Sequence, residues 1–204
     1  MHQKEITERE PEQLETENGK SAFFQTALEG LRMLILAIVI VALCFTFGVS
    51  IIRVDGNSMT PTLQNNDRLL VLSTLWCHPE QGDIVVLHKS SFLNQPVVKR
   101  IIATEGQTVD IDVSAGTVSV DGVILSEPYL SEPTFTAGDM TFPFTVSPNC
   151  VFVMGDHRNA STDSRWHQLG EVDRRDITGK VLGIVWPGAD DNGALHLNRI
   201  GGVS

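Results

Sequence analysis

The sequence predicts a mainly β protein, an antiparallel β domain carried on one N-terminal transmembrane helix. Three observations lead to this fold class: a long uncharged apolar run early in the chain, a series of short Val-, Ile- and Leu-rich segments after it, and an Asp-Gly dipeptide between two apolar segments. The 204 residues suit one domain with an anchor.

The apolar run is "MLILAIVIVALCFTFGVSII", from Met33 to Ile52. A helix of about 20 uncharged residues spans roughly 30 Å, the thickness of the hydrocarbon layer of a membrane. The alternative is a removable signal peptide, but the run exceeds a typical apolar core of about 7 to 15 residues and no small-x-small cleavage site follows. We therefore expect an uncleaved anchor over residues 31–52.

The charges beside the anchor predict its orientation. Lys20 and Arg32 precede it and Arg53 follows it, so the positive-inside rule favours a cytoplasmic N-terminus. Residues 1–30 begin with a charged stretch without an apolar stripe, and we expect a disordered cytoplasmic tail there. Residues 53–204 then form an extracytoplasmic β-rich domain.

Strand signals fill the second part of the chain. Gly, Pro, Asn or Asp separate the apolar segments, which is typical of strands joined by tight turns. The Asp-Gly in "TVSVDGVIL" (117–125) predicts a hairpin. The Pro-, Thr- and Phe-rich segment 126–149 lacks periodicity, and we expect either a flap over a substrate or a surface loop. The predicted strands are "RLLVLS" (68–73), "DIVVLH" (83–88), "VVKRIIA" (97–103), "TVDIDV" (108–113), "VFVMG" (151–155) and "KVLGIVW" (180–186).

Composition disfavours several functions. The formal net charge is −10 and the pI about 4.9, which argues against binding of nucleic acid. There is no Gly-rich phosphate loop and no His pattern of the HExxH kind, so we expect no metal and no organic cofactor. The three cysteines are far apart without a CxxC pair. Pairing of Cys77 with Cys150 stays open for an extracytoplasmic domain.

Ser58 is the candidate nucleophile in "VDGNSMTPTL" (54–63). A serine needs an activating base before it can attack an amide. The GxSxG elbow of α/β-hydrolases fails because Thr60 occupies the last glycine position. Two other bases remain: a histidine, His157 or His167, or a lysine.

Lys99 is the lysine that suits this role. Its pKa must fall by roughly two to three units from about 10.4, and burial among apolar side chains lowers it in that way. Val97 and Ile101 share its strand face, whereas Arg100 lies on the other face and cannot lose its proton. The alternative is an edge-strand lysine that protects against aggregation.

A third segment, "MGDHRNASTDSRWHQLG" (154–170), follows a predicted strand with closely spaced Asp, Ser and Arg residues. Such residues form rigid loops through Asx and Ser turns and Asp-to-Arg pairs. By itself this segment would be interpreted as a solvated turn, but its combination with the Ser58 segment and a buried Lys99 is much more specific.

Taken together, "GNSMTPTL", "GDIVVLH", "VVKRIIATEGQ", "GDHRNASTDSR" and "GKVLGIVWP" resemble the bacterial type I signal peptidases, which are membrane-anchored Ser/Lys endopeptidases. The segments occur in that family's order behind an N-terminal span and extend over most of residues 54–187. At position 99 this chain has a lysine, as the bacterial members of the family do, and not the histidine of the relatives of the endoplasmic-reticulum type.

The resemblance implies a role for each matching residue. Ser58 would be the nucleophile, Lys99 the general base and Ser161 the hydroxyl that orients the Lys99 amine. Asp163 and Arg165 would hold the loop. Substrate pockets would be formed by Met59, Leu63 and Val98.

The resemblance also implies the partners, which are preproteins with signal peptides cut after small residues, and the lipid bilayer. Some positions depart from the pattern. Gly56 replaces a serine that donates to the oxyanion in some members, and Asn159 with Ala160 stands where Asp-Asn is common. The short segment between Lys99 and Asp156 implies a reduced second lobe.

Two other functions compete with this interpretation. One is a noncatalytic, membrane-tethered β domain that binds envelope partners. The other is a sortase-like transpeptidase that uses Cys77, which would need a partner His and Arg.

Overall fold

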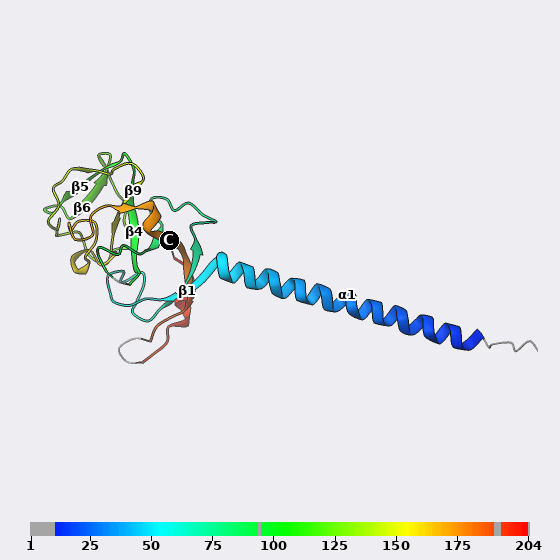
Figure 1. Ribbon diagram of the computed structural model, residues 1–204. Coiled ribbons are helices and arrows are strands. Elements are labelled where there is room, and N and C mark those ends of the chain that lie inside the picture. The colour runs from blue at the N-terminus through cyan, green and yellow to red at the C-terminus, as the bar shows by residue number, and fades with distance from the viewer. Residues whose placement is uncertain (1–10, 94, 190–192, 204) are drawn as a thin grey trace, which may run out of the picture. The chain divides into compact units, whose positions relative to one another are not determined.

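The computed structural model describes residues 11–93, 95–189 and 193–203. It divides into two units, Met1–Phe45 and Thr46–Ser204. The first contains most of one long helix, and the second contains all the strands that the structure describes (Figure 1).

The helix α1 runs from Pro11 to Phe47. Within it, Phe24–Leu43 is long and apolar enough to cross a membrane, with a mean hydropathy of 2.2. The predicted anchor is thus present as a helix, but both boundaries differ from our expectation.

At the N-terminal side, helix replaces the expected disordered tail over residues 11–30; residues 1–10 lie outside the described residues. Proline favours the first helical position, and the following Glu-, Gln-, Leu- and Ala-rich stretch has good helix propensity.

At the other side, α1 ends at Phe47, and residues 49–52 belong to a strand rather than to the anchor. Pairing with the neighbouring strand and the β-branched residues of "VSIIR" explain this difference.

The strands form two antiparallel sheets. The larger has the order β1-β2-β11-β3-β4-β9-β10, with β12 beside β11, and the smaller has the order β7-β6-β5-β8. The bounds are β1 Val49–Arg53, β2 Arg68–Ser73, β3 Ile84–Leu87, β4 Val97–Thr104, β5 Thr108–Asp112, β6 Thr117–Val120, β7 Val123–Ile124, β8 Phe144–Thr145, β9 Cys150–Met154, β10 Val172–Asp173, β11 Ile177–Trp186 and β12 Gly201–Gly202. Three short 3₁₀ helices, η1 Arg158–Ala160, η2 Arg174–Asp176 and η3 Leu197–Arg199, complete the described elements.

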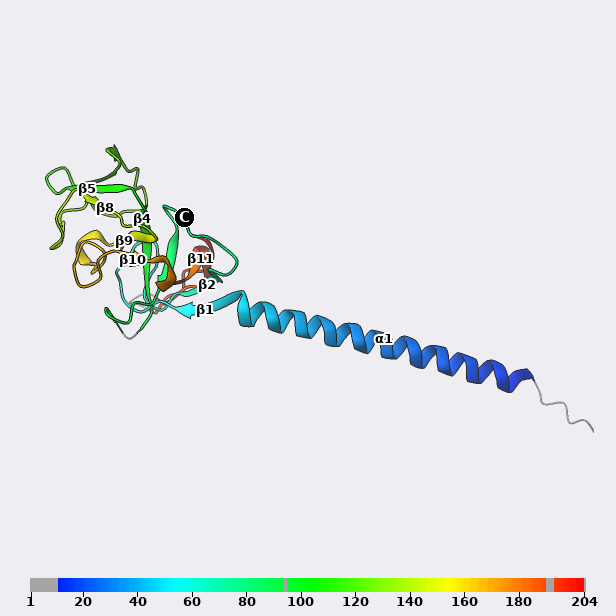
Figure 2. The same ribbon diagram turned by 45° about the horizontal axis from the view of Figure 1, so that its top comes forward.

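The mainly antiparallel β fold is confirmed, as is the predicted hairpin. Strands β6 and β7 pair around Asp121 and Gly122, both with positive φ, as a tight two-residue hairpin turn requires. The small sheet is the second lobe. It lies around β5 and β6 at one end of the unit, away from β1, in both Figure 1 and Figure 2.

The apolar core has three parts. One lies between β1, β2, β3 and β11 and includes Met59 and Leu63. A second joins the small sheet to β4 and β9, and a third covers the other face of β3, β4 and β9. Strand β4 contributes to both of the last two parts, so its central residues are almost completely buried.

Segment 126–149 is a surface loop, one of the two forms that the sequence suggested: only Thr134 and Val146 in it are buried, and its regular structure is the two-residue strand β8. It is tied to the loop after β9: Glu127 pairs with Arg158, and the Phe135 N–H donates to Asn159 Oδ1. Neither of the two cavities beside Ser58 and Lys99 is lined by it. This segment therefore supports the loop from behind.

Candidate active site

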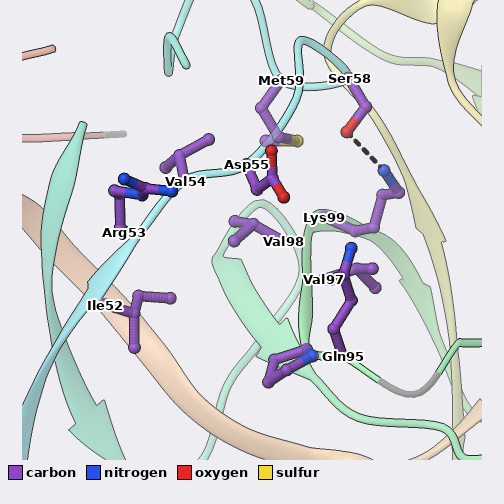
Figure 3. A pocket seen from close by; sticks show the side chains of 11 residues that line it. Ile52, Arg53, Val54, Asp55, Ser58, Met59, Gln95, Val97, Val98 and Lys99 are labelled. Atoms are coloured by element: carbon purple, nitrogen blue, oxygen red, sulfur yellow. Dashed lines mark hydrogen bonds between the residues drawn. The ribbon is translucent and has the colours of Figure 1, made fainter. Parts of the chain in front are cut away.

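Ser58 and Lys99 meet in the structure. The Lys99 amine donates a hydrogen bond to Ser58 Oγ at 2.6 Å (Figure 3). Lys99 lies in the middle of β4 and is 3% exposed. The edge-strand alternative is therefore wrong, because β4 has β3 on one side and β9 on the other.

Burial determines the charge state of this amine. Removal from water lowers the pKa of Lys99 from 10.5 to about 8. The Asp163 carboxylate opposes this shift, the Arg165 guanidinium adds to it, and Asp156 opposes it. A neutral amine, which can accept a proton, is therefore accessible near neutral pH.

The nucleophile lies in a tight turn after β1. The Thr60 N–H donates to Asn57 O at 3.2 Å, and Gly56, with a φ of 97°, donates its N–H to Asn65 Oδ1. Only a residue without a Cβ adopts such a φ without strain. The Ser58 carbonyl accepts from the His157 N–H at 3.0 Å, which joins the turn to the loop after β9.

The histidine alternatives are not supported by the geometry. The His157 ring contacts Thr60 Oγ1 and Asn57 O, and the His167 ring contacts Asp139. Lys99 is the basic side chain that the structure places on Ser58 Oγ.

Asp163 and Arg165 form a fully buried pair inside the loop. Arg165 donates two bonds of 2.8 Å to the carboxylate and further bonds to the carbonyls of Arg158 and Thr136. Asp163 in turn accepts the Gly155 N–H. These contacts fit the predicted supporting role.

Ser161 lies beside the nucleophile. Its Oγ is buried and has no hydrogen-bond partner in the described structure. The predicted hydrogen bond to Lys99 is not formed. Gly155 separates the two serines so closely that a Cβ there would clash with Ser161 Oγ and with the Ser58 carbonyl.

A cavity of about 430 Å³ opens beside the dyad between β1 and the start of β4. Met59 and Val98 line it, as expected (Figure 3). Leu63 does not, so its assignment to a pocket is wrong. Its N–H bonds to Met59 O in a helical turn, which directs it into the core, where it is 0% exposed.

Sequence reasoning missed other residues of this cavity, among them Ile52, Val54 and Asp55. Ile52 was counted with the anchor. The signal for a strand was the period-two alternation of Ile52, Arg53, Val54 and Asp55.

A second missed feature is the buried pair behind the dyad. Arg100 donates two bonds to Asp156, at 2.9 and 2.8 Å, and stacks on the Tyr129 ring at 3.9 Å. Asp156 also accepts from Thr62 in the nucleophile turn at 2.6 Å. The pair thus connects β4, the loop and the turn.

The C-terminal segment also reaches this region. Arg199 donates to both oxygens of the fully buried Asp67 carboxylate, at 2.9 and 2.7 Å. Asp67 closes the nucleophile loop, because it also accepts the Gln64 N–H.

The described residues contain no group of three or more His, Cys, Asp or Glu side chains arranged to hold a metal ion. Cys77 and Cys150 are both free thiols. Cys77 contacts the carbonyls of Leu72 and Ser73 rather than a histidine or an arginine, so the geometry does not favour the sortase-like alternative.

A buried amine on a serine hydroxyl, beside an apolar cavity in an antiparallel β domain, is the arrangement of a serine hydrolase with a lysine base. Comparison with known proteins specifies the class. The family "Signal peptidase, peptidase S26" matches residues 27–186, and the chain belongs to this family of serine peptidases.

Several signal peptidases I are similar to this chain. Signal peptidase I of Leptolyngbya laminosa is 35% identical over 170 residues, which cover 78% of this chain and 80% of that protein. Signal peptidase I of Bacillus licheniformis is 34% identical over 180 residues, covering 83% and 92%. A crystal structure of a signal peptidase I from Enterococcus faecalis is 32% identical, covers 51% of this chain and 97% of that one, and has a TM-score of 0.43.

Proposed function

We propose that this protein is a membrane-bound endopeptidase that cleaves signal peptides from preproteins with Ser58 as nucleophile and Lys99 as general base. The observation that carries this proposal is the 2.6 Å contact between the Lys99 amine and Ser58 Oγ, with the amine buried.

The reaction follows from the two groups. Ser58 Oγ attacks the scissile carbonyl carbon while neutral Lys99 takes the hydroxyl proton. The resulting ammonium gives that proton to the nitrogen of the leaving peptide as the C–N bond breaks, which leaves an ester on Ser58. A water then attacks the ester, passes a proton to Lys99 and releases the signal peptide, and Lys99 returns the proton to Ser58.

The developing oxyanion needs hydrogen-bond donors. The Ser58 backbone N–H is one, and Gly56 supplies no side-chain donor. Ser161 is proposed to orient the Lys99 amine once substrate has excluded water, since its hydroxyl is buried next to the nucleophile without another partner.

Substrate recognition uses the edge of the large sheet. Strand β1 pairs on one side with β2 and is the edge strand of its sheet. An extended peptide that pairs with the free edge would place alternate side chains in the cavity lined by Ile52, Val54 and Val98. A cavity partly filled by Met59 suits small residues before the cut.

The anchor brings the enzyme to its substrate. Residues 24–43 are proposed to span the membrane with the N-terminus in the cytoplasm and the peptidase domain outside. Signal peptides are held in the same bilayer by their own apolar segments, so both partners meet at its surface.

The test is cleavage of a preprotein whose signal ends in Ala-x-Ala by the detergent-solubilised full-length protein. Ser58→Ala and Lys99→Ala are expected to lose cleavage by at least about 1000-fold, whereas Lys180→Ala and Ser119→Ala serve as matched controls outside the site. Full activity in both Ser58→Ala and Lys99→Ala would remove the peptidase assignment and favour the binding-domain alternative.

A further inference from the structure

His157 holds the peptide groups on both sides of Ser58. Its backbone N–H donates to Ser58 O at 3.0 Å, and its ring Nδ1 lies 3.3 Å from Asn57 O. The first carbonyl belongs to the peptide bond after the nucleophile, and the second belongs to the peptide bond before it. One residue of the loop after β9 thus contacts the backbone of the nucleophile twice, whereas the Ser58 hydroxyl is contacted by Lys99.

The Asn57 carbonyl determines the direction of the Ser58 N–H. Both groups belong to one planar trans peptide, in which C=O and N–H point in opposite directions. Three groups donate to this carbonyl: the Thr60 N–H at 3.2 Å, Thr60 Oγ1 at 2.9 Å and the His157 ring at 3.3 Å. The Ser58 N–H, on the opposite side of the peptide, bonds to no acceptor within the described part of the chain. It is therefore open to an oxygen of the substrate.

The contacts of the ring assign its proton. Nδ1 lies 3.1 Å from Thr60 Oγ1, and that hydroxyl uses its own hydrogen in the bond to Asn57 O. A carbonyl oxygen can only accept. Both neighbours of Nδ1 are then acceptors, so the proton belongs on Nδ1, which shares it between the two oxygens in a three-centre bond.

The backbone around His157 makes it a firm support. Its chain neighbours Asp156 and Arg158 are both 0% exposed, and each forms an ion pair. On the far side of the ring, Nε2 lies 3.6 Å from Glu132 Oε1. The ring is therefore held between segment 126–149 and the turn of the nucleophile.

The direction of the Ser58 N–H matters because Gly56 offers no side-chain donor to the oxyanion. A hydrogen bond weakens steeply as it departs from linearity, and loss of one oxyanion donor typically lowers kcat by about 100- to 1000-fold. A donor on the Asn57 carbonyl also polarises the peptide, which strengthens its N–H as a donor.

We propose that His157 is a positioning residue for the oxyanion site: it fixes the peptide before Ser58 so that the Ser58 N–H points to the oxygen that becomes negative. This inference deepens the proposed function, on which it rests. Proton transfer stays with Lys99, and His157 acts only through the backbone of the nucleophile.

The first test compares two substitutions in the detergent-solubilised full-length protein, with a soluble peptide as substrate. His157→Ala is expected to lower kcat by about 10- to 100-fold with KM changed by less than about twofold. His157→Asn places an amide N–H near the position of Nδ1 but cannot transfer a proton, and it should restore kcat to within about threefold of wild type.

His167→Ala is the matched control. It removes another imidazole from the same loop, and the ring that is lost contacts Asp139 rather than the turn of Ser58. Its kcat and KM should equal those of wild type. Thr60→Val is a second, independent variant, because it removes another donor to the Asn57 carbonyl. It should lower kcat in the same way, and it decides the matter if His157→Ala does not fold.

Two inhibitors separate positioning from a general loss of structure. With a peptide aldehyde, Ser58 Oγ bonds to the aldehyde carbon and its proton passes through Lys99 to the aldehyde oxygen, which then accepts from the Ser58 N–H. The same peptide with CH₂ in place of the scissile carbonyl has no such oxygen. His157→Ala and Thr60→Val should weaken binding of the aldehyde by the factor seen in kcat and leave binding of the CH₂ analogue unchanged.

An unchanged kcat in both variants, no recovery in His157→Asn, or equal weakening of the two inhibitors would overturn the inference. Failure of the peptidase assignment gives a different result: the aldehyde would not bind wild type, or cleavage would survive in Ser58→Ala.

Discussion

At the scale of single residues, the chemistry depends on one buried amine. Lys99 is surrounded by apolar strands, and its pKa of about 8 reflects mainly the loss of water. The nearby Asp163 and Asp156 carboxylates limit the shift. The protein therefore combines a base that is partly neutral at physiological pH with a hydroxyl in direct contact.

The pH dependence of cleavage follows from this pKa. The amine must be neutral to accept the Ser58 proton, so kcat/KM on a soluble peptide should rise tenfold per pH unit below about 8 and level off above it. Initial rates of peptide cleavage measured between about pH 6 and about pH 10 give this pH dependence. A flat profile through pH 8 would contradict a lysine base.

Ser161 provides a second prediction at this scale. Because its buried hydroxyl has no partner, Ser161→Ala should leave thermal stability unchanged within about 1 kcal/mol. If the hydroxyl orients Lys99 during the reaction, kcat should fall by roughly 100-fold with little change in KM. An unchanged kcat would show that Lys99 is positioned without Ser161.

Residue types alone predicted part of this site. A serine after the anchor and a lysine between apolar strand residues could be recognised, because nucleophile and base have few chemical alternatives. Ser161, Asp163 and Arg165 came from the resemblance. Leu63 was misplaced because a local helical turn, which the sequence does not signal, directs it into the core.

At the scale of elements, the loop after β9 organises the site. It holds Asp163 and Arg165 inside, receives the turn of Ser58 through the His157 N–H, and is supported from behind by segment 126–149. The supporting segment adds a second buried pair, Arg158 with Glu127, at 2.5 Å.

Asp163→Asn tests this loop. The substitution leaves the buried Arg165 charge without a carboxylate, and the free energy of unfolding should fall by about 3 to 5 kcal/mol. Asp173→Asn is the matched control, since it breaks an exposed pair with Arg175 and should change stability little. Denaturant unfolding of both variants in detergent compares them. Equal losses of unfolding free energy in the two variants would show that burial does not determine how much the Asp163–Arg165 pair stabilises the protein.

Element boundaries show where sequence patterns are informative. The segment 68–73 and the hairpin around Asp121 were predicted at their observed positions, because strong alternation and an Asp-Gly turn are local signals. The start of β1 was not, because "VSII" continues the apolar composition of the anchor. Only pairing with β2, which is a long-range contact, makes it a strand.

At the scale of the whole molecule, the chain combines an anchor with a catalytic unit that contains its own cores. In the proposed function the substrates are confined to the same membrane surface, which would raise their effective concentration. The anchor is then expected to contribute to rate rather than to chemistry.

A chain that starts at Thr46 tests this division. It should cleave a soluble peptide with a kcat close to that of the full-length protein, but should cleave a membrane-inserted preprotein at least about 100-fold more slowly. Initial rates on both substrates provide the measurement. Loss of peptide cleavage in a folded fragment would show that the helix is part of the catalytic machinery.

The contact between Arg199 and Asp67 has a consequence for biosynthesis. The two residues are 132 positions apart, and the nucleophile loop is closed by a carboxylate whose positive partner is translated near the end of the described chain. While the ribosome still holds Arg199, this loop contains a negative charge without its counterion. The nucleophile loop is therefore expected to reach its final form only after Arg199, 132 positions further along the chain, has been made.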